Sequence, residues 1–296
     1  MTRIRAGSYF QQKSDGSPLV LPDGKLDRAK LIALSRFDDV CLSAVPWAQG
    51  LDGEPRTDAI FALRRLNTRI RLWLYVPVDP WLPREWVSQR SDWSAYTLIH
   101  AELAAGNGFL YGTDGDWWHE MYRVNAGDAD TMTRLGEVLA GMVCLRLFDG
   151  IFLDNLSPSI AWTNGSEGRT LDVARAGFGS LAEMDAARLA NIEALIKKLH
   201  DTWPPLLVAL NGTGPRPAGL DYDFREGLGS LITDNAAKQW MRSPGNHWLK
   251  LEEYGGDCAT ARTRLRSIAV SASGEAIISA GPNTDWPPCP TYPEQQ

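Results

Sequence analysis

The chain of 296 residues is poor in the side chains that metal sites and disulfide frameworks require. It contains only four histidines and four cysteines, and none of them shows the short spacing of a zinc site. The cysteines are widely scattered along the chain: Cys41, Cys144, Cys258 and Cys289. Such a sparse set does not suit a disulfide framework, so we expect reduced thiols in the core or on the surface.

The sequence also lacks long basic or apolar runs. A net charge of −6 and the lack of a lysine–arginine run interleaved with aromatics argue against nucleic acid as a partner. No run approaches the roughly 20 apolar residues of a membrane span, so no membrane partner is expected. The first residues, MTRIRAGSYFQQ, contain no apolar signal segment. We therefore expect a cytoplasmic or virion-associated protein, unless a leader was removed.

Several common catalytic motifs are missing as well. The stretches NGTGPRPAG and EGLGS match neither the dinucleotide nor the P-loop fingerprint, and no GxSxG occurs. The pair His119 and Glu120 lacks the second histidine of HExxH. The segment DGDWWHE resembles a calcium loop only in its first three residues, which favours a solvated acidic turn. No metal or cofactor is therefore expected.

What the sequence does have is a regular alternation of short apolar segments and amphipathic stretches. The expected strands are residues 4–10, 39–45, 70–76, 150–154, 206–211, 222–226, 248–252 and 276–280. The expected helices are residues 26–36, 58–66, 85–105, 132–142, 189–199, 234–241 and 258–272. This alternation implies a parallel sheet covered by helices, and eight such units at this length favour a closed (β/α)8 TIM barrel.

The barrel is expected to be the single folded domain. We place it at residues 1–284, followed by a proline-rich tail at 285–296. The connection between the third and fourth strands, residues 77–147, is long and carries the tryptophan-rich stretch YGTDGDWWHEMYRVNAGD. In a barrel, loops that follow strands lie at the carboxyl-end rim, where catalytic groups are found.

Two acidic residues at strand ends are the candidate catalytic pair. The apolar stretch LFDGIFLDN closes on Asp154 and Asn155, and Glu226 ends the sixth expected strand. Glycoside hydrolysis uses two carboxyl groups across the anomeric carbon. Strands two positions apart have backbones about 10 Å apart, which suits both retaining and inverting geometries, so the stereochemical outcome stays open.

Other polar and aromatic residues at the rim are candidates for binding a sugar, because an indole face can stack on a sugar ring. The candidate binding residues are Tyr75, Asn155, Asn211, Glu252, Trp47, Trp117 and Trp118. The alternative for the tryptophans is that they fill gaps in the core. Because side chains alternate along a strand, only one of Glu252 and Glu253 can point inward, and Arg225 should face away from Glu226.

The same segments resemble a known family. The run RVNAGDADTMTRLGEVLAGMVCLRLFDGIFLDN is similar to the fourth-strand region of hypothetical glycosyl hydrolase barrels and of the endo-α-1,4-polygalactosaminidase family. LVALNGTG resembles their fifth strand and YDFREG their sixth. The resemblance implies a TIM barrel in which Asp154 is catalytic and Glu226 is its partner. From the expected surroundings of the two groups, we predict that Asp154 is the nucleophile or base and that Glu226 is the proton donor.

Two functions remain open on this basis. The first is a glycosidase that cleaves an extended polysaccharide. The second is a barrel that binds a glycan without cleaving it, for example a phage virion tail or cell-surface component with assembly partners of its own.

Overall fold

The computed structural model describes residues 3–9, 25–43, 57–78, 108–116, 123–161, 164–165, 170–227, 232–251 and 258–280. The expected helix over 85–105 and the expected tail over 285–296 lie outside these ranges. Within them, no helix is both long enough and apolar enough to cross a membrane.

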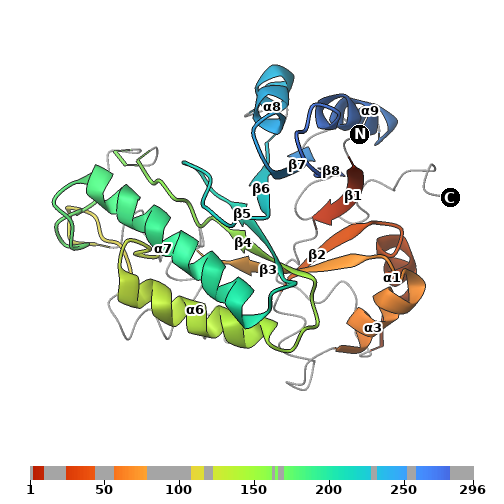
Figure 1. The fold of residues 1–296 in the computed structure, drawn as a ribbon, viewed down its shortest axis with the longest axis horizontal. Helices are drawn as coiled ribbons and strands as arrows, with labels where there is room; N and C mark the ends of the chain where they lie inside the picture. Colours follow the sequence, from red (N-terminus) through yellow and green to blue (C-terminus); the bar gives the residue numbers. More distant parts are fainter. Residues whose placement is uncertain are drawn as a thin grey trace. The chain divides into compact units, whose positions relative to one another are not determined.

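Eight strands form a closed parallel barrel, and their order around it follows the sequence from β1 to β8 (Figure 1). The strands are β1 (Ile4–Tyr9), β2 (Asp39–Ser43), β3 (Arg71–Pro77), β4 (Gly150–Asp154), β5 (Leu207–Asn211), β6 (Tyr222–Arg225), β7 (Asn246–Leu251) and β8 (Ala276–Ala280). Each expected strand is present, and no end differs from expectation by more than two residues. The predicted (β/α)8 barrel, with its long connection between β3 and β4, is therefore confirmed.

The helices also follow the expected pattern. They are α1 (Arg28–Leu34), α3 (Thr57–Leu66), α6 (Ala129–Val143), α7 (Leu181–Thr202), α8 (Asp234–Met241) and α9 (Cys258–Ala269). Polar caps fix where several of them begin. Before α6, the Asp128 carboxylate accepts a hydrogen bond from the Thr131 backbone N–H at 2.7 Å. Before α7, the Ser180 hydroxyl accepts one from the Glu183 N–H, which satisfies a donor that the helix itself cannot pair.

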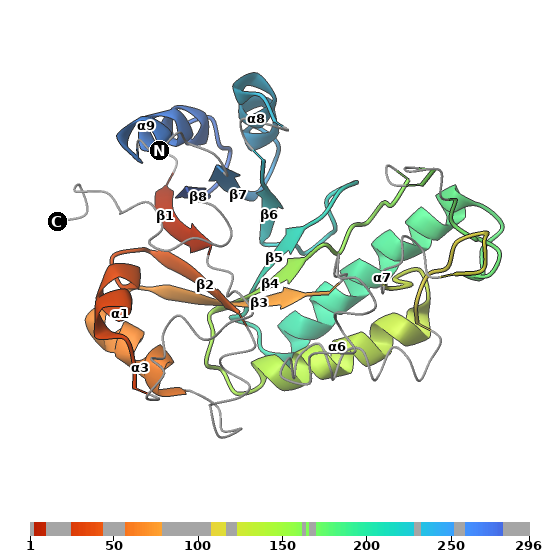
Figure 2. The same cartoon turned by 180° about the vertical axis from the view of Figure 1, so that it is seen from behind.

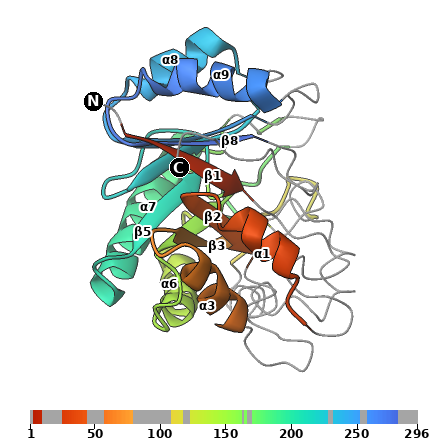
Figure 3. The same cartoon turned by 90° about the vertical axis from the view of Figure 1, so that its right-hand side faces the viewer.

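The chain forms two compact units. The first comprises Met1–Tyr75, Leu147–Phe152 and Asp221–Gln296, and the second comprises Val76–Arg146 and Leu153–Leu220. In the first unit, α1 packs beside α3, and α8 and α9 lie together on the outer side of β7 and β8 (Figures 2 and 3). In the second unit, α6 and α7 pack along each other (Figures 1 and 2).

A layer of aromatic rings fills the barrel interior of the first unit. The rings of Phe152 and Phe224 meet edge to face at 4.7 Å, and Trp248 contacts both, at 5.5 and 5.8 Å. Trp73 approaches Trp248 at 5.4 Å. These side chains come from β3, β4, β6 and β7, and rings from strands that are not neighbours can meet only inside the barrel. Gly150 leaves room for the layer, because a Cβ there would lie 2.4 Å from the Trp73 ring.

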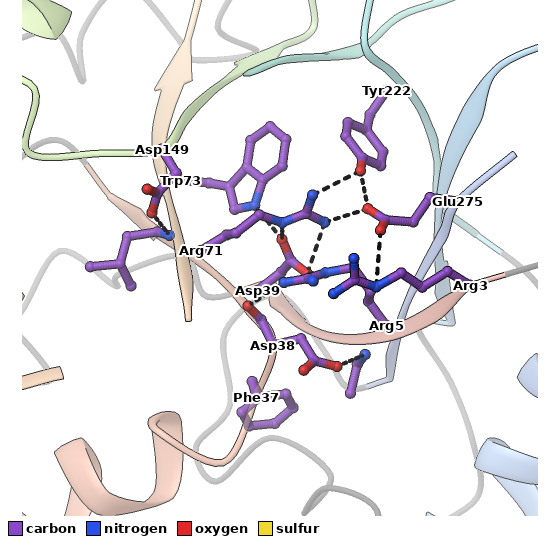
Figure 4. Close-up of polar contacts among 12 residues, drawn as sticks. Arg3, Arg5, Phe37, Asp38, Asp39, Arg71, Trp73, Asp149, Tyr222 and Glu275 are labelled. Carbon is purple, nitrogen blue, oxygen red and sulfur yellow. Dashed lines mark hydrogen bonds and ion pairs between the residues drawn. The ribbon is translucent and has the colours of Figure 1, made fainter. Parts of the chain in front are cut away.

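Beneath the aromatic layer, at the amino ends of the strands, lies a buried polar network (Figure 4). The Asp39 carboxylate accepts hydrogen bonds from Arg5 Nε at 2.5 Å, Arg71 Nε at 2.6 Å and Trp73 Nε1 at 2.8 Å. Arg71 also donates to Glu275 at 2.8 Å and to the Tyr222 hydroxyl at 3.0 Å. One guanidinium thus joins β2, β3, β6 and the residue before β8, and each buried charge has an opposite charge beside it.

This network shifts the titration of its members. Burial would raise the pKa of Glu275, but the hydrogen bond from the Tyr222 hydroxyl and the charge of Arg71 outweigh burial and lower that pKa. For Tyr222, burial is the largest influence, and it raises the pKa of the phenol. The hydroxyl therefore stays protonated and donates to Glu275. A lowered carboxyl pKa stabilises the fold above the unfolded-state pKa and loses that contribution as the pH falls through the folded-state pKa.

We predict that Glu275→Gln lowers the free energy of unfolding at pH 7 by about 1–3 kcal/mol, because Arg71 and Tyr222 lose a charged partner. As the pH falls from 6 to 3, wild type should lose stability more steeply than the variant, since the variant has no carboxyl to protonate there. Denaturant unfolding at several pH values measures this. Glu137→Gln, which alters an exposed pair with Lys198, is the control and should change little. Parallel acid profiles for wild type and Glu275→Gln would contradict the prediction.

Candidate functional site

Asp154, the last residue of β4, lies in the second unit with its carboxylate held by amide groups. The residue is only 5% exposed. Asn211, which ends β5, donates from Nδ2 to Asp154 Oδ1 at 2.8 Å. The adjacent Asn155 donates from Nδ2 to Oδ2 at 3.4 Å. Both carboxylate oxygens therefore accept hydrogen bonds, which fixes the rotation of the group.

The backbone around Asp154 is shaped to allow this arrangement. Asn155 has a φ of 60°, in the left-handed region that few residues other than glycine adopt, although asparagine tolerates it better than most. After β5, a Cβ at position Gly212 would lie 2.7 Å from the carbonyl oxygen of Leu156, so only glycine allows the two segments to come this close. Backbone strain of this kind is found preferentially at functional sites.

Glu226 follows β6 in the first unit and lies beside a buried lysine. The Lys250 ammonium is 3.5 Å from Glu226 Oε2. The Lys250 side chain is 1% exposed, whereas the Glu226 side chain keeps 30% of its surface exposed. The pair therefore joins a fully buried cation to a carboxylate that solvent still reaches.

Arg225 points away from Glu226, as the strand alternation predicted. Its guanidinium lies over the ring of Trp240 on α8, 5.9 Å from the ring centre. Trp240 in turn donates from Nε1 to Asp223 at 2.7 Å. Arg225 and Asp223 thus belong to the outer face of β6, which packs against α8, while Tyr222 and Phe224 are buried on the inner face.

Tyr75, predicted to bind substrate, packs into the aromatic layer. Its ring stacks on Phe152 with 5.9 Å between centres and 24° between planes, and the residue is 8% exposed. The structure thus places the Tyr75 ring against Phe152, and its contact with a substrate stays a prediction. Trp47, Trp117, Trp118 and Glu252, the other predicted binding residues, lie outside the described residues.

The described residues offer no cluster of three histidine, cysteine, aspartate or glutamate side chains that could hold a metal ion. In the same part of the chain, Cys41 is buried and Cys144 is exposed, and neither forms a disulfide.

The sequence analysis did not single out Lys250, which the structure places beside Glu226. Asn211 donates to Asp154, and its contact with a substrate stays a prediction. Lys250 could have been found from the strand period, because it lies two residues after the inward-facing Trp248 and so shares its face. However, Lys250 begins the charged stretch KLEE, and such a stretch is more typical of a solvated strand end.

Comparison with known proteins identifies relatives of the fold only. No family model and no curated protein sequence matches the chain. Among solved structures, a variant of the glycoside hydrolase domain of PelA from Pseudomonas aeruginosa matches with a TM-score of 0.55 and 12% identity, over 94% of each chain. A β-galactosidase from the psychrophilic Marinomonas ef1 matches with a TM-score of 0.54 and 10% identity. An α-galactosidase from Lactobacillus brevis matches with a TM-score of 0.52 and 9% identity.

The two galactosidases are much longer than this chain. The match covers 94% of this chain in both cases, but 53% of the β-galactosidase and 37% of the α-galactosidase. At these identities the comparison shows a shared barrel fold alone, and the chemistry has to be argued from the residues of this chain.

We predict that Asn211→Asp makes stability depend on pH in the direction opposite to that at Glu275. At pH 8 two ionised carboxyl groups would stand at hydrogen-bond distance and repel each other, which lowers the free energy of unfolding by at least about 2 kcal/mol. As the pH falls toward 4, one shared proton restores a hydrogen bond, and the variant should regain stability relative to wild type. Denaturant unfolding at both pH values measures the difference.

Asn211→Leu is the control, since it removes the amide donor and adds no titrating group. It should stay destabilised relative to wild type at both pH values. If Asn211→Asp and Asn211→Leu show the same dependence on pH, Asn211 does not contact the Asp154 carboxylate in solution.

Proposed function

We propose that this protein is a glycoside hydrolase that cleaves an extended polysaccharide with two carboxyl groups, those of Asp154 and Glu226. One group protonates the glycosidic oxygen as the bond from that oxygen to the anomeric carbon breaks. The other assists attack at the anomeric carbon, either as a base that takes a proton from water or as a nucleophile that water later displaces. In sum, one water molecule is added across the bond.

The observation that carries this proposal is the setting of Asp154. A carboxylate that ends a buried barrel strand, is 5% exposed and is oriented by two amide donors costs desolvation energy that a purely structural residue could avoid. Amide donors orient a carboxylate without neutralising its charge. Asp154 thus suits the role of nucleophile or base, and its position at a strand carboxyl end is where barrel enzymes hold catalytic groups.

Glu226 supplies the second carboxyl group of the proposal. It follows the inward-facing Phe224 by two residues, and its side chain remains 30% exposed, so a substrate oxygen can reach it. We assign it as the second catalytic carboxyl group. Arg225, which could have paired with it, lies over Trp240, and the Lys250 ammonium lies 3.5 Å from Glu226 Oε2.

The comparisons support the same reaction class. The matched PelA domain is described as a glycoside hydrolase domain, and the other two matches as β- and α-galactosidases. Barrel folds host many chemistries, so this likeness raises the expectation of glycosidase activity without assigning a sugar. The alternative, a barrel that binds glycan without cleaving it, predicts affinity for a polysaccharide and no release of reducing ends.

The experiment compares purified wild type with Asp154→Asn and Glu226→Gln on a panel of bacterial polysaccharides, with new reducing ends as the readout. Wild type should cleave at least one of them. Each variant should lose about a hundredfold or more in kcat, the size expected for a group that transfers a proton or forms the covalent bond. Thermal unfolding confirms that each variant is folded.

Two surface variants serve as matched controls. Asp201→Asn and Glu137→Gln make the same chemical changes in the exposed ion pairs with Lys197 and Lys198, and they should retain full activity. If Glu226→Gln keeps the wild-type rate, another residue is the acid. If wild type binds a polysaccharide and never cleaves one, the binding function is correct and the hydrolase proposal is wrong.

A further inference from the structure

Lys250 is a buried cation inside the barrel of the first unit. It lies on β7 two residues after Trp248, whose ring packs against Trp73, Phe152 and Phe224 in the aromatic layer. The alternation of the strand sends Lys250 to the same inner face, one layer nearer the carboxyl end. The residues on either side of Lys250, Leu249 and Leu251, face outward, into the core formed with α8 and α9.

Glu226 reaches the same level from the neighbouring strand. On β6, Tyr222 and Phe224 point inward, so Glu226 continues that series. β6 and β7 pair in parallel, and Phe224 stands opposite Trp248, so the residues two positions further on, Glu226 and Lys250, come side by side. The 3.5 Å separation of their charged atoms follows from this register.

A buried ion pair of this kind contributes little net free energy to the stability of a barrel. Burying an ammonium costs several kcal/mol, and apolar residues of similar size often stabilise a core as well as a buried ion pair does. The amino-end network shows the structural solution, in which the Asp39 carboxylate, with a fully buried side chain, is flanked by two arginines. At the carboxyl end the cation is buried and its carboxylate stays partly open, an arrangement that directs the carboxylate outward.

We propose that Lys250 is a positioning residue that holds the Glu226 carboxyl group in the orientation needed to act on a glycan. The proposal rests on the function proposed above, in which Glu226 is a catalytic residue. Lys250, at 1% exposed, acts through Glu226 and does not itself meet the substrate. A misplacement of a catalytic group by about 1 Å can lower the rate by about two orders of magnitude. The ion pair between Lys250 and Glu226 would prevent such a misplacement.

The first test is a double-mutant cycle on the polysaccharide that wild type cleaves. Lys250→Met keeps the apolar stem and removes the charge, and it should lower kcat about tenfold to a hundredfold while KM stays nearly constant. In a Glu226→Gln background the same change should cause no further loss, because Lys250 acts only through Glu226. Lys250→Arg, which keeps the charge, should recover part of the rate. Lys197→Met, in an exposed pair with Asp201, is the control.

The second test needs no activity. Carboxyl groups are coupled to an amine with a carbodiimide, and the labelling of Glu226 is followed by peptide mass spectrometry, with Glu137 as the internal reference. Labelling of Glu226 should rise severalfold in Lys250→Met relative to wild type, because the carboxylate is released from its ion pair. Thermal unfolding of both proteins verifies that the increase does not come from unfolding.

The outcomes separate the two proposals. If wild type cleaves a polysaccharide but Lys250→Met lowers kcat equally in both backgrounds, or not at all, Lys250 is not a positioning residue and the hydrolase function stands. If Glu226 is labelled equally in wild type and Lys250→Met, the ammonium does not hold the carboxylate, and the proposal is overturned. If wild type cleaves nothing, the proposed function fails and the positioning role falls with it.

Discussion

The aromatic layer in the barrel interior is the constraint on which the candidate site depends. Its rings come from β3, β4, β6 and β7 and pack edge to face at about the separations that aromatic pairs prefer. Since a strand repeats every two residues, fixing Phe152, Phe224 and Trp248 in this layer also fixes which later residue of each strand points inward. In the first unit, the next inward positions carry Glu226 and Lys250. Packing in the core thus brings these two charged groups side by side.

The two polar layers on either side of the aromatic rings differ in how their charges are balanced. At the amino ends, Asp39 receives two arginines and an indole N–H, and Arg71 reaches four hydrogen-bond acceptor atoms on three residues (Figure 4). Such mutual neutralisation makes a closed network that suits a structural role. At the carboxyl ends of β6 and β7, the Lys250 ammonium lies 3.5 Å from Glu226, whose side chain remains 30% exposed. The proposed chemistry uses this partly exposed carboxylate.

The fold could be predicted from the sequence because its signals are local. The apolar run that ends in Asp154 defines β4 to the residue, and glycine at its start is required by the Trp73 ring. The outward direction of Arg225 follows from the strand period alone. Asp154 and Glu226 could be named as candidates for the same reason, since both stand where a recognisable strand ends.

The features that could not be predicted depend on pairing between strands. Asn211 lies 57 positions from Asp154, and nothing in either segment shows that its amide reaches that carboxylate. Lys250 lies in a charged stretch that is typical of a solvated strand end, and its contact with Glu226 follows from the register of β7 against β6. The hydrogen bond from Arg71 to Glu275 joins residues 204 positions apart, and no local sequence pattern predicts it. These contacts join segments that lie far apart in the chain, so a local sequence pattern does not indicate them.

The most direct measurement of the central claim is a crystal structure of the Asp154→Asn variant with an oligosaccharide of the polysaccharide that the protein binds. We expect the sugar to lie at the carboxyl ends of the strands. One anomeric carbon should then be within about 3–3.5 Å of the side chain at position 154, with its glycosidic oxygen within hydrogen-bond reach of Glu226. An oligosaccharide bound to the outer helices, with both positions unoccupied, would contradict the proposed role of these two residues.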